Sequence, residues 1–195
     1  MEWALGRPRF QREREQALAA AGGEVLEIGF GTGLNLRHYP PGVKRLTALD
    51  VADLLPARTG RRIAAAPFPV ERVRLTAERL PFPDARFDCV VSTWTLCSIP
   101  DALAALREVR RVLAPGGLYA FLEHGRSDDP RVARRQDRFN PIQRVIGVGC
   151  NLNRPIDGLV RDAGFAITRL DRYVIEGEPR IMAEMYRGTA SPRAS

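Results

Sequence analysis

Three glycines at alternate positions and a later aspartate are the residues of this chain best suited to hold a ligand. The glycines follow a short apolar run, and glycine there lets the backbone turn with positive φ and approach a ligand closely. A dinucleotide fingerprint would need glycine at Leu34, and no Gly-Lys-Ser/Thr follows for a P-loop. Asp50 ends the next apolar run, where a carboxylate accepts hydrogen bonds from both hydroxyls of a ribose. The pattern indicates a ribose without a pyrophosphate. The three glycines are Gly29, Gly31 and Gly33.

A second group of residues could move a proton. Glu123 and His124 end the apolar run that begins at Leu118, and Cys97 lies shortly after the run that ends at Thr93. His124 is one of only two histidines, and its titration near neutral pH suits removal of a proton from an acceptor. Alternatively, His124 donates to a nearby backbone carbonyl and only shapes the pocket. Cys97 is expected to be a small buried apolar residue and not a nucleophile.

Strand-like and helix-like segments alternate along the chain and must position these residues. This order predicts an α/β fold with a doubly wound, mostly parallel sheet that helices cover on both faces. Asp101 is expected to cap a helix that Pro115-Gly116-Gly117 stops. The last two strands read as an antiparallel hairpin at one edge. The seven expected strands are 25–28, 45–51, 71–75, 87–93, 118–123, 166–174 and 180–187, and the expected helices are 9–21, 34–39, 53–65, 101–113 and 156–163.

Length and composition favour one folded domain over residues 1–195. The chain is 45% hydrophobic and 27% charged, as in ordinary globular proteins, and only its ends, especially 188–195, look disordered. No apolar run is long enough to span a bilayer, and the first residues do not resemble a secretory signal, which favours the cytoplasm. The three cysteines are odd in number and form no CxxC pair, which favours a reducing compartment and predicts no metal site.

The net charge of +7 raises nucleic acid or an anionic membrane as a partner. The arginines are spread along the chain and form no polybasic run. We therefore expect no nucleic-acid partner and at most peripheral contact with a membrane, although an RNA-modifying protein remains the alternative that the charge suggests.

Four segments together resemble the class I methyltransferases that use S-adenosylmethionine. They are VLEIGFGTG at 25–33, LD at 49–50, AERLPFPDARFDCVVS at 77–92 and LREVRRVLAPGG at 106–117, and the resemblance covers residues 20–187. It implies a Rossmann-like methyltransferase fold and S-adenosylmethionine as the cofactor. The glycines would line its methionine part, Asp50 would hold the ribose, and residues 76–78 would border the adenine. The cofactor-binding residues it implies are Glu27, Gly29, Gly31, Gly33, Asp50, Val51, Thr76, Ala77, Glu78 and Thr93.

Two of these positions have a second interpretation. In the family an acidic residue at Glu27 helps to organise the loop and the ammonium group of the cofactor, but the carboxylate could equally cap local backbone amides. Many relatives carry Asp where this chain has Thr76, so contact with the adenine amino group would fall to the backbone amide of Ala77. Thr93 and Trp94 would lie beside the point of methyl transfer, although Trp94 could simply fill the core.

A finer resemblance narrows the chemical class of the methyl acceptor. TLCSIPDALAALREVRRVLAPGG, LEHGR at 122–126 and GCNLNRPI at 149–156 resemble thiol S-methyltransferase-like proteins, with phospholipid and quinone methyltransferases as neighbours. This implies a small apolar acceptor, a thiol sulfur first and a phospholipid amine or quinone carbon next. A protein that binds the cofactor only as a scaffold or sensor is the alternative.

Residues 125–153 interrupt the strand and helix alternation and are expected to cover the substrate. Apolar side chains there could line a pocket, or they could only pack the helix, while the arginines stay solvated. The site is expected to be open or closed by a partner subunit, as in a homodimer. The apolar residues are Phe139, Ile142, Val145 and Ile146, and the arginines are Arg131, Arg134, Arg135 and Arg138.

Overall fold

The computed structural model describes residues 5–193, and strands and helices alternate along them as predicted. The strands that pair in parallel come first along the described part of the chain, and two further strands follow the last helix. The strands are β1 (Gly23–Ile28), β2 (Val43–Leu49), β3 (Val70–Val73), β4 (Phe87–Thr93), β5 (Leu113–His124), β6 (Phe165–Val174) and β7 (Glu184–Pro192). The helices are α2 (Pro8–Leu18), η1 (Leu36–His38), α3 (Pro56–Ala64), α4 (Ala102–Val112), α5 (Pro130–Ile146) and α6 (Ile156–Asp162).

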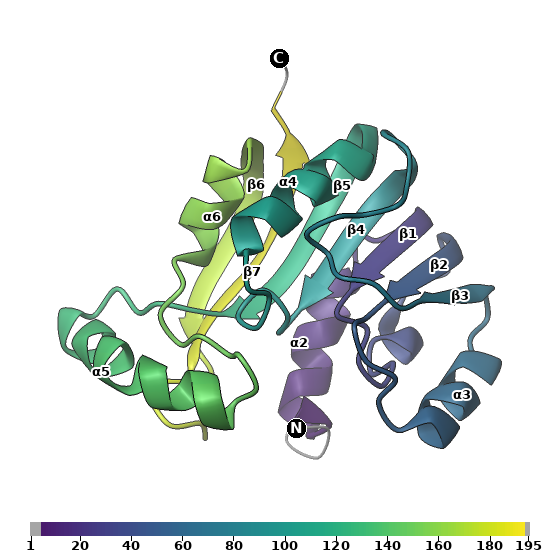
Figure 1. Ribbon diagram of the computed structural model, residues 1–195. Helices are drawn as coiled ribbons and strands as arrows, with labels where there is room; N and C mark the ends of the chain where they lie inside the picture. Colours follow the sequence, from purple (N-terminus) through teal and green to yellow (C-terminus); the bar gives the residue numbers. More distant parts are fainter. Residues whose placement is uncertain (1–4, 194–195) are drawn as a thin grey trace.

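The strands form one sheet in the order β3-β2-β1-β4-β5-β7-β6, which Figure 1 shows from one face. All neighbours from β3 to β5 pair in parallel, and β7 pairs antiparallel with both β5 and β6. The order reverses between β1 and β4, and ligands of such sheets bind beyond the carboxyl ends of the strands at this point. The predicted doubly wound sheet with an edge hairpin is therefore present.

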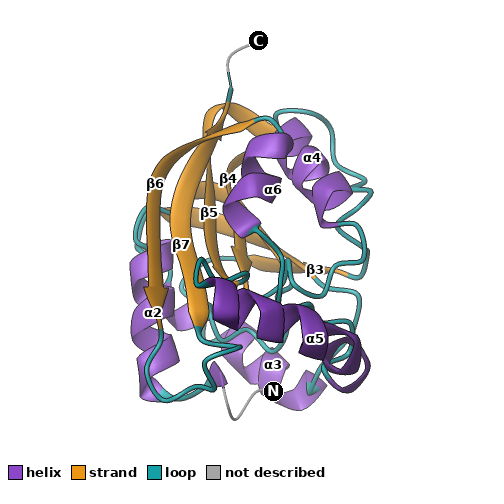
Figure 2. Cartoon of the chain, turned by 90° about the vertical axis from the view of Figure 1, so that its left-hand side faces the viewer, coloured by secondary structure: helices purple, strands orange, loops and turns teal. Residues whose placement is uncertain are grey.

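Helices cover the two faces of the sheet, and Figure 2 shows α2 on one side of the strands and α4 and α6 on the other. Successive strand residues point to opposite faces, so Leu26 and Ile28 join the buried cluster that contains the apolar side chains of α4 and α6. Val25 points the other way and shares a cluster with Leu18 of α2. Burial on both faces explains why the successive residues Val25 and Leu26 of β1 are both apolar.

The boundaries of α4 and β5 differ from the prediction in one respect. The Asp101 side chain caps α4 by accepting from the Ala104 backbone N–H at 2.9 Å, as expected. The helix ends at Val112, however, and β5 begins at Leu113, so residues 115–117 lie within the strand and do not stop the helix. Leu113 lies opposite Phe87 of β4, and the next pair is Leu118 with Cys89, so residues 114–117 form an irregular stretch of the strand.

The final strand also differs from its predicted position. The expected strand at 180–187 begins later, at Glu184, and continues to Pro192, so the expectation of disorder was wrong for residues 188–192. Residues 194 and 195 lie outside the described range. Pairing with β5 on one side and β6 on the other orders this segment, since its backbone N–H and C=O groups have partners in both neighbours. Within residues 5–193, no helix combines the length and the apolar character needed to cross a membrane.

Candidate functional site at the carboxyl edge of the sheet

The glycine turn after β1 adopts the backbone that its sequence predicts. Gly29, Gly31 and Gly33 have φ of 72°, 59° and 76°, a region that side chains with a Cβ rarely adopt. A Cβ on Gly29 would lie 2.0 Å from Oγ1 of Thr95, so this glycine lets the turn pack against the segment after β4. A Cβ on Gly31 would meet nothing within 4 Å and would project into open space. Gly31 therefore leaves room above the sheet for another molecule.

Asp50 lies directly after β2 and faces this turn. Its Oδ2 accepts from the Gly31 N–H at 2.7 Å, and its Oδ1 accepts from the Ala52 N–H at 3.0 Å. Each carboxylate oxygen can accept more than one hydrogen bond, so both keep acceptor capacity for the hydroxyls of a ribose. Asp50 also lines a cavity of about 240 Å³ that extends from Phe30 to Arg74.

Glu27 is buried at the end of β1, and side chains hold it in place. Its Oε1 accepts from Asn35 Nδ2 at 2.9 Å and its Oε2 accepts from the Tyr39 hydroxyl at 2.7 Å. Burial raises the pKa of Glu27 to about 7, against the opposing effect of these hydrogen bonds and of Arg14. The alternative interpretation assigned backbone amides to this carboxylate, whereas its observed donors are side chains.

Arg14 of α2 completes this network, and the sequence analysis did not single it out. Its Nη1 donates to Asn35 Oδ1 at 2.6 Å and to Thr93 Oγ1 at 3.1 Å. Burial lowers its pKa to about 10, so it remains a cation at neutral pH. The guanidinium also stacks on the ring of Trp94, 4.6 Å from its centroid. A signal was present in the sequence, because a charged residue stands four positions after Phe10 on the apolar stripe of the helix.

Arg14 contacts both of the residues that were predicted to lie near the point of methyl transfer. Thr93 is buried and receives hydrogen bonds from both Arg14 and Asn35. Trp94 has a φ of 50° and packs edge to face on Phe10 at 5.4 Å, so it is partly buried against α2. The turn at Trp94 directs the chain from the end of β4 toward Thr95 and Cys97.

Residues 76–78, which are predicted to border the adenine, lie partly at the surface and partly in the core. Thr76 and Val51 are exposed, whereas Ala77 is buried in the cluster that contains Ile28. The Glu78 carboxylate accepts from the Asp101 backbone N–H at 3.4 Å, which ties this loop to the start of α4. The segment therefore lies over the carboxyl ends of the strands, with Thr76 at the surface.

Glu123 is fully buried, and its position explains how the loop after β4 is held. Its carboxylate accepts from Ser92 Oγ at 2.8 Å, from the Thr95 N–H at 2.8 Å and from the Leu96 N–H at 3.2 Å. Burial raises its pKa to about 7 despite these donors. With three donors already bound, Glu123 organises the loop and is poorly placed to take a proton from an acceptor.

His124 ends β5 and contacts sulfur. Its Nε2 lies 3.2 Å from the Sγ of Cys150, and its buried Nδ1 has no hydrogen-bond partner among the described residues. The alternative in which His124 donates to a backbone carbonyl is therefore not observed. Hydrogen bonding to Cys97, together with burial, raises the pKa of the Cys150 thiol to about 12. Cys97 is buried, as expected from the sequence.

The segment expected to cover the substrate forms α5 at the carboxyl edge of the sheet (Figure 1). Gln136 fixes the helix by donating to the Gly125 carbonyl at 2.9 Å and accepting from the Ser127 N–H at 2.9 Å. The four predicted apolar residues neither line a closed pocket nor pack the helix, because all are exposed, from 46% at Phe139 to 80% at Val145. The four predicted arginines are exposed, as expected.

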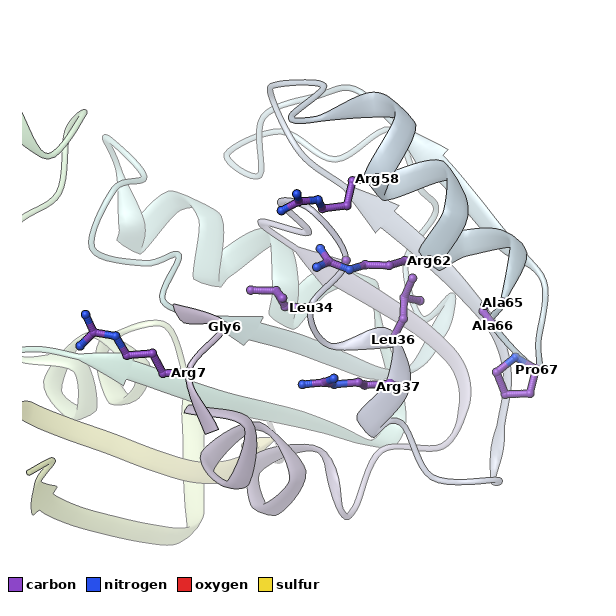
Figure 3. Close-up of a pocket in the computed structure, with 11 residues that line it drawn as sticks. Gly6, Arg7, Leu34, Leu36, Arg37, Arg58, Arg62, Ala65, Ala66 and Pro67 are labelled. Carbon is purple, nitrogen blue, oxygen red and sulfur yellow. The ribbon is translucent and has the colours of Figure 1, made fainter. Parts of the chain in front are cut away.

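A larger cavity of about 520 Å³ lies on the outer side of the glycine turn (Figure 3). Arg58 and Arg62 extend into it from α3, and Leu34 of the turn forms part of its wall. Arg62 Nη1 donates to the Thr32 carbonyl at 2.8 Å, which links α3 to the turn. This cationic cavity was not expected from the sequence, since its arginines come from separate elements.

Comparisons with known proteins agree with this architecture. A family model described as a methyltransferase domain matches residues 26–121, which run from β1 into β5. Thiol S-methyltransferase TMT1B of Homo sapiens is 35% identical over 172 residues, covering 80% of this chain and 66% of the relative. The ubiquinone/menaquinone biosynthesis C-methyltransferase UbiE of Hahella chejuensis is 34% identical over 125 residues, covering 62% and 50%. The chain thus spans about half to two thirds of the length of these relatives.

A solved structure supports the fold. The crystal structure of a putative methyltransferase from Bacillus halodurans superposes with a TM-score of 0.69 at 19% identity, covering 92% of this chain and 95% of that one. The predicted Rossmann-like methyltransferase fold is therefore confirmed.

Proposed function

This chain belongs to the family of S-adenosylmethionine-dependent methyltransferases, and we propose that it transfers a methyl group from S-adenosylmethionine to a small apolar acceptor, with thiol sulfur preferred. The family and the fold imply S-adenosylmethionine as the cofactor. The observation that carries the proposal is the open space at Gly31, with the Asp50 carboxylate hydrogen-bonded to the same backbone N–H. A Cβ at this glycine would occupy the space that an adenosine-bearing ligand needs.

The residues around the turn fit the parts of this cofactor. Asp50 would accept from the ribose hydroxyls with the acceptor capacity that its carboxylate retains. Glu27 would interact with the ammonium group, since its carboxylate is buried at the end of β1 and faces Asn35. Arg14 is the buried cation nearest to that carboxylate network and suits the carboxylate of the methionine part.

Methyl transfer from this cofactor needs alignment more than activation. When bound, the cofactor supplies a methyl group that its sulfonium already activates, so the protein must align acceptor, methyl and sulfur and exclude water. A thiol becomes a much better nucleophile when it loses its proton. His124 would promote that loss, because it is at the end of β5 and carries a buried ring nitrogen without a hydrogen-bond partner among the described residues.

Two observations support a thiol as the methyl acceptor. The human relative is named a thiol S-methyltransferase, and the exposed apolar side chains of α5 suit an apolar molecule approaching the carboxyl edge. The relative from Hahella chejuensis is named a C-methyltransferase, which keeps a quinone-type carbon as the alternative. A phospholipid amine is the third acceptor class.

Product analysis tests the proposal directly. The purified protein would be incubated with S-adenosylmethionine labelled on the methyl group and separate pools of thiols, amines, phenols and lipids, and the products identified by mass spectrometry. We expect labelled thioethers together with S-adenosylhomocysteine. Calorimetric binding of the cofactor without methyl transfer to any pool would instead identify a scaffold or sensor.

The role of His124 can be tested by substitution, and His38, the other histidine of the chain, provides the matched control. We expect His124→Asn to lower turnover by about 100-fold or more while cofactor affinity stays nearly unchanged, because the change removes the titratable ring from the transfer point. His38→Asn should retain turnover, since His38 contacts Gln11 and Arg37 and lies outside the site. Turnover is measured with the best acceptor, and wild-type rates for His124→Asn would refute the role.

A further inference from the structure

Two thiols and an imidazole meet at the carboxyl edge of the sheet. Cys97, His124 and Cys150 come from the loop after β4, from the end of β5 and from the segment after α5, and their ligand atoms all lie within 4.8 Å of one another. His124 Nε2 and Cys150 Sγ are 3.2 Å apart. The cluster lies outside the glycine turn and Asp50, and the proposed cofactor site does not require either cysteine.

Hydrogen bonds between the loops fix this meeting point. Asn151 donates to the carbonyl of Cys97 through both its backbone N–H and its Nδ2, each at 2.8 Å. Asn140 of α5 accepts from the Leu152 N–H at 2.7 Å and donates to Asn151 Oδ1 at 3.3 Å. The segment directly after Cys150 is thus tied both to the loop that carries Cys97 and to α5. Such ties preorganise the sulfurs, which lowers the entropic cost of binding one ligand between them.

The three side chains have few strong partners of their own. Besides Cys150, Cys97 Sγ has only weak contacts, at 3.8 Å to the Trp94 carbonyl and 3.5 Å to Ser98 Oγ. The His124 Nδ1 atom is buried without a partner among the described residues. The three groups therefore bond mainly to one another through weak sulfur contacts, and a ligand that binds sulfur and nitrogen strongly could replace those contacts.

The donor set identifies the chemistry of that ligand. Two cysteine sulfurs and one imidazole nitrogen form a common ligand set for Zn²⁺, with Zn–S near 2.3 Å and Zn–N near 2.0 to 2.1 Å. A tetrahedral ion with these bonds places its ligand atoms about 3.5 to 3.8 Å apart. One observed separation is 3.2 Å and none exceeds 4.8 Å, so small side-chain rotations would bring the three atoms to this spacing. Three protein ligands leave a fourth position open.

We propose that Cys97, His124 and Cys150 bind a zinc ion whose open position takes the sulfur of the thiol acceptor. This deepens the proposed function and rests on it for the identity of the acceptor. Two protein thiolates and a substrate thiolate give Zn²⁺ a net negative charge, and Arg154 is placed to balance it. Its Nη2 donates to the Pro100 carbonyl at 3.2 Å and its Nη1 to the Leu96 carbonyl, which holds the guanidinium beside the loop that carries Cys97.

The site would change how the acceptor loses its proton. The thiol would release its proton to solvent when its sulfur binds the ion, and the sulfur would keep the electron pair that attacks the methyl carbon. The bond from that carbon to the sulfonium would break with its electrons left on the donor sulfur. The neutral thioether, a poor ligand, would then leave. In this scheme His124 would promote loss of the thiol proton as a ligand of the ion and not as a direct base.

Metal titration tests the site without any need for turnover. The full-length protein, reduced and stripped of metal with a chelator, would be titrated with Co²⁺ alone and then with Zn²⁺ alone in competition with a chromophoric chelator. We expect one equivalent to bind, with the thiolate-to-cobalt charge-transfer absorption of a tetrahedral site, and Zn²⁺ to raise the thermal midpoint. Absence of binding to the fully reduced protein would overturn the proposal.

Single substitutions identify the ligands. Cys97→Ser, His124→Asn and Cys150→Ser should each weaken Zn²⁺ binding by at least about 100-fold and reduce the charge-transfer band. Cys150→Ser is the most informative variant, because Cys150 is only partly buried and the change is the least damaging to the fold. Cys89→Ala is the matched control, since Cys89 is in the core cluster around Val25 and should leave Zn²⁺ affinity unchanged. Equal affinity in all four variants would overturn the site.

Two further measurements test the zinc site and the methyltransferase function separately. A small apolar thiol, added to the Co²⁺ protein, should alter the charge-transfer spectrum through a third thiolate, and Cys150→Ser should abolish that change. A spectrum that ignores the thiol would overturn the acceptor role. Calorimetry with S-adenosylhomocysteine tests cofactor binding on its own, so loss of that binding would contradict the proposed function while the metal readouts still decide the zinc site.

Discussion

At the scale of single residues, the acids at the carboxyl edge of the sheet differ in how many hydrogen bonds their oxygens already accept. Glu123 receives three donors and holds a loop, whereas Asp50 receives one donor on each oxygen. Spare acceptor capacity distinguishes a binding carboxylate from a purely structural one. This difference makes Asp50 the residue whose loss should affect the cofactor most.

Asp50→Ala should weaken binding of S-adenosylhomocysteine by about 1–3 kcal/mol, the range for hydrogen bonds to a charged group. Isothermal calorimetry measures the affinity, and thermal unfolding verifies the fold. Asp88→Ala is the control, because Asp88 accepts from the Glu24 N–H at 2.8 Å near the start of β4, away from the turn. An unchanged affinity for Asp50→Ala would contradict the ribose assignment.

Glu27 should make stability depend on pH. Its pKa is about 7 when folded and near 4.5 ordinarily, so between these values the folded protein binds a proton that the unfolded chain has released. The free energy of unfolding should therefore fall as pH rises from about 4.5 to about 7, by up to about 3 kcal/mol from this group. Glu27→Gln should remove that slope.

Urea unfolding of wild type and Glu27→Gln at several pH values measures the effect. The difference between the two slopes isolates Glu27 from other titrating groups, including the buried Glu123. Parallel slopes for the two proteins would show that Glu27 is ionised throughout and would contradict the raised pKa.

At the scale of elements, the turn between β1 and η1 needs glycine for two different reasons. One glycine packs closely against a neighbouring loop, and another leaves open space for a ligand. Gly29 faces Thr95 in the neighbouring loop, whereas Gly31 faces open space. Both have positive φ, so any side chain is strained there by roughly 1–2 kcal/mol. The two positions should therefore respond differently to the same substitution.

Gly31→Ala should fold with a modest loss of thermal stability and lose at least about 10-fold in cofactor affinity, because its methyl group occupies the open space. Gly29→Ala should lower the thermal midpoint further, since its Cβ would lie 2.0 Å from Thr95 Oγ1. Calorimetry and thermal scans of both variants provide the measurement. A Gly31→Ala protein with wild-type affinity would place the cofactor elsewhere.

At the scale of the whole molecule, the net charge of +7 comes from arginines that are spread along the sequence, although four of them line the cavity beside the glycine turn. Many arginines pair with acids of the same chain, which neutralises much of their field at short range. Arg111 bonds Glu108 and Asp84, Arg126 bonds Asp137, and Arg187 bonds Glu13 and Asp171. We expect arginines that are paired in this way to contribute little to binding a phosphate backbone.

We therefore expect weak binding to single-stranded RNA with a shallow dependence on salt. A surface making 6–10 phosphate contacts loses about 10³- to 10⁵-fold in affinity between 50 and 200 mM salt. Fluorescence anisotropy with labelled RNA over this range measures the slope. A steep slope together with tight binding at low salt would favour the RNA-modifying alternative.

Local patterns in the sequence determined the strands, the glycine turn and the approximate positions of the helices. A strand or turn depends on residues adjacent in the chain, so Phe87 to Thr93 and the conformations of Gly29, Gly31 and Gly33 could be predicted. The position of Asp50 after the second strand indicated a ribose-binding residue, and the resemblance to methyltransferases added Glu27. The final strand was misplaced because β5 and β6 set its extent through pairing, and turn residues near Gly188 indicated disorder.

Only the tertiary structure decided which distant side chains meet. Arg14 reaches the Asn35 and Glu27 network because α2 packs beside η1, and nothing local in α2 specifies that contact. Cys150 and His124 are 26 residues apart and meet because Asn151 bonds the carbonyl of Cys97. Such contacts depend on loop closure and packing between elements, which composition and periodicity do not encode.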